Sequence, residues 1–167
     1  MAAATLTIKD DEVNAALQRL YDAVGDITPA LKNIGEEEAD VTRDRFSEEV
    51  DPWGRAWAPL NPLYQKTKKG PGILRGQTRD LSTIIWQLAS EQSVEIGSSV
   101  IYARIHQEGG VIKAKNAAAL VFSMGGQTFK RKSVTIPQRQ FLGFNDESRA
   151  RALAIVEDFL DAAYQGG

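Results

Sequence analysis

The stretch DPWGRAWAPLNPLYQKTKKGPGILRG, residues 51–76, separates a region with helical periodicity from a region with strand-like alternation. It contains four prolines and four glycines, so no long regular element fits within it. Lys66, Lys68 and Lys69 make it basic. A loop of this length is typically functional, or disordered when it is isolated. We therefore predict a long, basic, Pro/Gly-rich loop over 51–76.

The residues before this loop predict a strand and two helices. Thr5–Ile8 alternates apolar and polar side chains, which indicates a short strand. Apolar residues spaced three and four apart predict an amphipathic helix over 11–24. Thr28 followed by proline is a typical helix start, and helical spacing then continues to about Val50. Because the connection between the two helices is short, we expect them to be antiparallel.

The residues after the loop predict a small, mostly antiparallel sheet and a final helix. A short helix leading into a strand is expected at 80–88, and helical or turn structure at 100–108. Further strands are expected at 94–97, 118–122, 128–132 and 133–136. The chain is thus predicted to be one α+β domain over 1–167, in which a helical part (1–50), the loop (51–76), a sheet-forming part (77–143) and a C-terminal helix (144–164) follow one another.

The net charge of −2 hides a strong division along the chain. Residues 1–51 carry 13 acids and 5 bases, whereas residues 52–139 carry 13 bases and 4 acids. Residues 140–167 carry 5 acids and 2 bases. Such asymmetry indicates a polarised surface that meets a charged partner or another copy of the chain, unless acidic helices neutralise a basic sheet within one subunit.

A basic region in the middle of the chain is the strongest candidate for binding nucleic acid. Phe122 and Phe129 lie near it and suit either stacking on bases or packing in the core. No known binding motif is present, and the sequence pI near 5.5 is low for an autonomous binder. Contact with a neighbouring subunit is the other reading. The candidates for either contact are Lys113, Lys115, Lys130, Arg131 and Lys132.

Catalytic and metal-binding signatures are absent from the sequence. The chain has no cysteine and a single histidine, His106, whose nearby Glu108 is poorly placed to orient it on a helix. The consecutive acids Glu36, Glu37 and Glu38 point around a helix, so we expect them on a solvated face. No apolar run is long enough for a membrane span, and no signal peptide is recognisable. We expect neither an enzyme nor a cofactor.

Three short motifs nevertheless occur in order along the chain. They are D-P-x-G-x-x-W over 51–57, Y-A-x-I-H-Q-x-G-G over 102–110 and I-P-x-R-x-F-L-G over 136–143. Together they resemble the phage virion morphogenesis family, which includes the tail-completion proteins of P2-like phages and the G protein of Mu-like phages. The resemblance covers residues 40–160. The motif residues taken from it are Tyr102, His106, Gln107, Gly109, Gly110, Pro137, Arg139 and Phe141.

The resemblance implies a structural protein of the neck of a tailed phage. Such proteins form rings, commonly hexamers, at the head–tail junction, with genomic DNA passing through the lumen. The partners expected are further copies of the chain and adjacent neck, stopper or tail-tube proteins, in a virion assembled in the host cytoplasm. Tail terminators, stoppers and head-completion proteins form adjacent layers there. A DNA-binding or head-completion accessory factor of packaging is the alternative function.

We expect the loop 51–76 to contact a neighbouring subunit or ring. Trp57 anchors it either in an apolar pocket of the neighbour or in the core of its own subunit. The loop residues expected at such an interface are Asp51, Pro52, Trp53, Gly54, Trp57, Lys66, Lys68 and Lys69.

Overall fold

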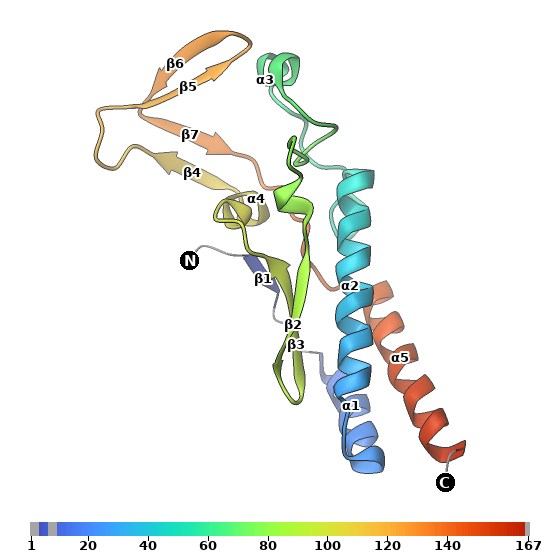
Figure 1. The fold of residues 1–167 in the computed structure, drawn as a ribbon. Helices are drawn as coiled ribbons and strands as arrows, with labels where there is room; N and C mark the ends of the chain where they lie inside the picture. The colour runs from blue at the N-terminus through green and yellow to red at the C-terminus, as the bar shows by residue number, and fades with distance from the viewer. Residues whose placement is uncertain (1–3, 7–9, 166–167) are drawn as a thin grey trace.

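The computed structural model describes residues 4–6 and 10–165, and it has a mixed α+β fold (Figure 1). Its helices are α1 (Asp11–Val24), α2 (Thr28–Glu48), α3 (Pro62–Thr67), the 3-10 turn η1 (Asp80–Ser82), α4 (Ala103–Glu108) and α5 (Asp146–Gln165). Its strands are β1 (Ala4–Leu6), β2 (Ile85–Ser90), β3 (Ser93–Ser98), β4 (Gly110–Lys113), β5 (Leu120–Met124), β6 (Gln127–Arg131) and β7 (Ser133–Ile136). Part of the predicted strand at 5–8 lies outside the described residues.

Helices α1, α2 and α5 lie together on the right-hand side of the molecule in Figure 1. Asp10 caps α1 by accepting hydrogen bonds from the amides of Glu12 and Val13, and Gly25 ends the helix in the left-handed conformation. Both α1 and α2 pack against α5, so the expected N-terminal helix pair is completed by the C-terminal helix. The core that they share comprises Val13, Ala16, Leu17, Leu20, Ile27, Ala30, Leu31, Ile34, Ala152 and Val156.

A three-stranded antiparallel sheet, in the order β1-β3-β2, packs against α2 on the side away from α5 (Figure 1). Gly35 permits this close approach, because a Cβ atom there would lie 2.8 Å from Val94 and 3.0 Å from the Trp86 ring. A second core forms around this sheet and the C-terminal half of α2. Its largest buried members include Phe46, Trp57 and Phe141.

Two separate ribbons, β4–β7 and β5–β6, project from this body, and we call residues 110–136 the arm (Figure 1). Each ribbon is an antiparallel pair of strands. Together with the β1-β3-β2 sheet they make three small sheets, where we expected one. The sequence did not predict β4, because Gly109-Gly110 resembles a helix stop and the strand that follows is short. The arm's far end comprises the connection between β4 and β5 and the junction of β6 with β7, and the turn of the β5–β6 hairpin lies near α3.

The buried face of α2 contradicts one prediction. Glu38 was expected on a solvated face, but it is 3% exposed and accepts a hydrogen bond from Ser148 on α5 at 2.9 Å. Arg151 lies 3.6 Å from the same carboxylate. Because helix α5 brings these polar partners to α2, the carboxylate is buried with compensation, which a triplet of glutamates alone does not reveal.

No helix within the described ranges, 4–6 and 10–165, has the length and apolar character needed to cross a membrane.

Candidate interaction site at the base of the arm

The three sequence motifs meet where the arm joins the body. Trp57, from the first motif, packs edge-on against Phe46 with ring centroids 5.4 Å apart. Its indole N–H donates to the carbonyl oxygen of Gln140 in the third motif at 2.8 Å. Trp57 is only 5% exposed. The tryptophan therefore anchors the loop in the core of its own subunit, which is one of the two anchoring sites left open by the sequence.

Gln107 joins the second motif to the third through a single side-chain amide. Its Oε1 accepts hydrogen bonds from the backbone N–H groups of Phe141 and Leu142, each at 3.0 Å. Its Nε2 donates to the carbonyl oxygen of Leu142 at 2.8 Å. Three backbone polar groups beside buried apolar side chains are thus satisfied by one residue, which uses both the acceptor and the donor of its amide.

Arg139 joins the third motif to the loop that follows the first. Its guanidinium donates to the carbonyl oxygens of Ala58 at 2.7 Å and Pro59 at 2.9 Å. Its backbone N–H donates to the carbonyl oxygen of His106 at 2.8 Å. Burial lowers the pKa of Arg139 below its ordinary value. Arg139 therefore holds the loop through its side chain and the second motif through its backbone N–H.

Two motif glycines lie where a neighbouring segment leaves no room for a side chain. Gly109 has a φ of +70°, and a Cβ atom on it would lie 2.8 Å from the amide nitrogen of Gln138. A Cβ atom on Gly143 would lie 2.5 Å from Pro52. Pro52 is itself buried. The motifs therefore hold segments that are far apart in the sequence at van der Waals distance.

Asp51 shapes the turn that leads into the loop. Its carboxylate accepts hydrogen bonds from the amides of Trp53 at 2.9 Å and Arg55 at 3.0 Å, and from the Arg55 Nε at 2.7 Å. Desolvation opposes the charged form, but these hydrogen bonds outweigh it and lower the pKa of Asp51. Asp51 thus acts within its own turn, while the Trp53 that follows is exposed.

The three loop lysines differ in their surroundings. The Lys68 ammonium donates to the carbonyl oxygens of Lys69, Gly70 and Arg75, so it closes the loop on itself. Desolvation lowers its pKa. The side chains of Lys66 and Lys69 are exposed. Of the three lysines, Lys66 and Lys69 are therefore the two whose side chains are fully available to a partner, so the expected interface depends on these two.

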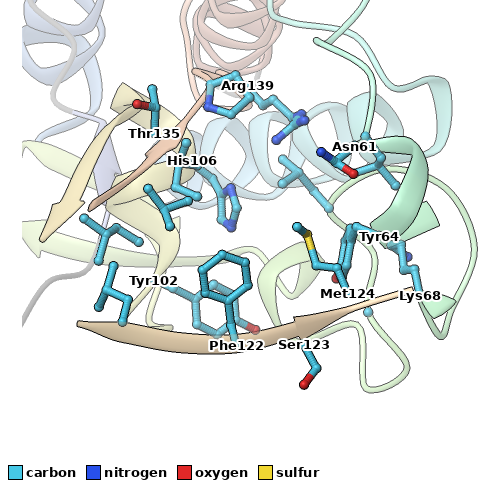
Figure 2. A pocket seen from close by; sticks show the side chains of 18 of the residues that line it. Asn61, Tyr64, Lys68, Tyr102, His106, Phe122, Ser123, Met124, Thr135 and Arg139 are labelled. Atoms are coloured by element: carbon cyan, nitrogen blue, oxygen red, sulfur yellow. The ribbon is translucent and has the colours of Figure 1, made fainter. Parts of the chain in front are cut away.

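A cavity of about 760 Å³ lies between the arm and the loop. Figure 2 shows Phe122 and Met124 of β5 pointing into it, while Ser123 points away. Phe122 also stacks on Phe129 of β6, with centroids 5.9 Å apart. The alternation along β5 thus directs its larger apolar side chains toward the cavity, as expected for the core-facing reading of Phe122.

His106 and Tyr102 line the same cavity from α4 and the turn before it (Figure 2). Their rings meet edge-on at 6.1 Å. Burial, and secondarily the charge of Arg139, lower the pKa of His106, which favours the neutral ring. Its Nδ1 has no hydrogen-bond partner among the described residues. In the part of the chain that the structure describes, no three acidic or histidine side chains are grouped to hold a metal ion.

The five basic candidates gather at the far end of the arm, and we call Lys113, Lys115, Lys130, Arg131 and Lys132 the basic bend. Lys113 pairs in register with Ser133, and the amide of Ala114 donates to the carbonyl oxygen of Lys132 at 3.3 Å. All five are exposed. None forms an ion pair with a residue in 4–6 or 10–165. The acidic helices therefore do not neutralise the basic bend within the described subunit.

A match to one known family spans all three motifs. A model of the phage virion morphogenesis family matches residues 8–161, nearly the whole chain. A search of curated proteins and a search of solved structures each find no match.

Proposed function

This chain belongs to the phage virion morphogenesis family, and from this premise we propose that it forms a ring at the head–tail junction of a tailed phage. In this role it is a tail terminator or tail-completion protein that is needed to join head to tail. It acts as a structural protein without catalysis, located in the neck of the virion. The ring is a homo-oligomer, most simply a hexamer, that touches adjacent neck, stopper or tail-tube proteins and surrounds the genomic DNA.

The observation that carries this proposal is the set of contacts that the family motifs make. Trp57, Gln107 and Arg139 bind backbone groups of the same chain, and their contacts fix the loop and the arm to the body. Because the motif residues hold projecting segments in place, they support a role in assembly. The exposed apolar side chains of the arm, such as Val121, support contact with further subunits.

The experiment is complementation of a phage that lacks the gene, with electron microscopy of the products. We expect loss of the protein to leave filled heads and complete tails unjoined, and labelled protein to lie at the neck of rescued particles. The variant Lys66→Glu/Lys69→Glu reverses the two exposed lysines of the loop and should reduce joining. Lys32→Glu, on the exposed face of α2, is the control for reversing a lysine outside the loop.

Two results would contradict the proposal. Normal plaques from phage without the gene would show that the protein is not needed for joining. A position of the labelled protein away from the portal–tail axis would exclude a neck ring. The alternative, a DNA-binding or head-completion accessory factor, predicts heads that lose or fail to retain DNA, and salt-dependent DNA affinity of the isolated chain.

A further inference from the structure

An acidic groove of about 470 Å³ lies between the C-terminal half of α2, the turn at 50–54 and the start of α5. Five acids line it: Asp44, Glu48, Asp51, Asp146 and Glu147. Asp44 and Glu48 are four residues apart on α2, where like charges destabilise a helix. Neither has an ion-pair partner among the described residues. The groove thus presents uncompensated negative charge.

The groove also contains a buried donor without an acceptor. Arg45 lines it, is 5% exposed, and uses its Nη1 to bind the carbonyl oxygens of Phe141 and Gly143. Its Nη2 has no hydrogen-bond partner in the described part of the chain. A buried guanidinium N–H without an acceptor is costly, so it favours an occupant that brings an oxygen. A polypeptide segment with basic side chains supplies both a carbonyl oxygen and cations.

Trp53 forms an aromatic wall of the same groove. It is 53% exposed, and Arg55 lies over its ring at 5.4 Å. Exposed tryptophan and arginine residues are enriched among the side chains that dominate protein interfaces. Together with Arg45, this residue indicates that the groove binds protein.

The basic bend has the complementary properties. Its cations have no acidic partner in the described chain, and they lie on strand segments whose backbone carbonyl oxygens are close by. In Figure 1 the arm lies on one side of α2 and α5 lies on the other. The two surfaces therefore cannot meet within one subunit in this arrangement, but they can meet between successive copies. Such a heterologous contact closes into a ring when its rotation permits.

We propose that the basic bend of one copy docks in the acidic groove of the next copy. The proposal rests on the proposed ring and names its contact surfaces. Asp44 and Glu48 receive Lys130 and Lys132 of the next copy. The balance of charge favours another copy over DNA, because the groove repels phosphates, while Asp44, Glu48 and the cations of the basic bend have no ion-pair partner in the described part of the same chain.

A charge swap tests this contact on the full chain. The bend variant is Lys130→Glu/Lys132→Glu, which leaves Arg131 in place over Phe129. The groove variant is Asp44→Lys/Glu48→Lys. Each variant alone should weaken self-association about 100-fold in sedimentation velocity, because every contact now joins like charges. An equal mixture should restore association to within about tenfold, because each altered surface then meets its opposite.

The control is Glu157→Lys/Asp158→Lys, which makes the same charge change on the exposed distal part of α5. It should associate as the unaltered chain does. Thermal unfolding of every variant establishes that it is folded before association is compared. The chain has no cysteine, so a Glu48→Cys/Lys132→Cys variant offers a second measurement, in which oxidation should give linked dimers and higher species.

Several results would overturn the docking. These are a groove variant that associates normally, a mixture that does not restore association, or an unaltered chain that does not associate together with a Glu48→Cys/Lys132→Cys variant that does not form linked dimers. Loss of DNA binding by the bend variant, without rescue in the mixture, would assign the bend to DNA instead. If the unaltered chain still lies at the neck of the virion, these results leave the proposed function intact; its absence from the neck overturns that function separately.

Discussion

The helical bundle and the arm bury their apolar side chains to very different extents. In the bundle, Leu20 is 1% exposed and Val156 is fully buried. In the arm, Val111 is 52% exposed and Val121 is 61% exposed. An isolated two-stranded ribbon is marginally stable in water. The bundle is therefore stable through its own core, whereas the arm depends on its attachment at the base and on contacts from outside the subunit.

This contrast explains why the family motifs lie at the base of the arm. The bundle needs only apolar spacing and helix caps, which many sequences provide. The base must join segments more than 80 residues apart, as in the hydrogen bond from Trp57 to Gln140. Such a junction requires particular side chains, so the recognisable motifs concentrate there.

The largest effect is expected from removing the central side chain of that junction. Phe141 is fully buried and packs on Phe46 with centroids 5.2 Å apart. Phe141→Ala should lower the free energy of unfolding by about 3–5 kcal/mol, measured by urea denaturation. Phe129→Ala makes the same change at a half-buried side chain of the arm, and it should lower the free energy of unfolding by only about 1 kcal/mol. Equal losses would show that the arm is as well supported as the body.

An intermediate effect is expected from the buried carboxylate in the bundle. Desolvation raises the pKa of Glu38, against the opposing effects of Ser148 and Arg151. Glu38→Ala leaves the arginine charges near it without that partner, so we expect a loss of about 3 kcal/mol in urea denaturation. Glu37→Ala is the matched control, because Glu37 also contacts Arg151, at 3.4 Å, but is 43% exposed in its side chain. The control should lose less than about 0.5 kcal/mol.

The local features of the fold could be predicted from the sequence. Helix α1 spans the predicted residues 11–24, and β7 spans the predicted residues 133–136, because spacing, caps and a following proline determine them locally. The α+β class followed from the same local patterns. The end of α2 and the start of α5 were likewise close to the predicted positions.

The long-range features could not be predicted in this way. The burial of Glu38 depends on Ser148, which is 110 residues away. The split of the expected sheet into three depends on which strands pair, and this choice leaves no periodic signal in a single sequence. The motifs indicated the residues of the arm's base, but their function as mutual backbone clamps required the distances of Gln107 and Arg139.

The smallest expected effect is on the pH dependence of stability, to which the two regions contribute with opposite signs. The pKa of His106, beside the arm's cavity, is lowered by burial, so below its ordinary value of 6.5 the unfolded chain binds a proton that the folded chain does not. Stability is therefore lost as the pH falls through this window. The raised pKa of Glu38, in the bundle, has the opposite effect on stability: the contribution of Glu38 is lost as the pH rises above the ordinary carboxyl value.

The variant His106→Phe removes only the effect of the histidine, because Glu38 titrates in both proteins. Between about pH 7 and about pH 5.5, we expect the variant to lose about 0.5 kcal/mol less than the unaltered chain. Identical slopes of unfolding free energy against pH would show that the histidine is as solvated in the folded protein as in the unfolded chain, and that the cavity under the arm is open to water.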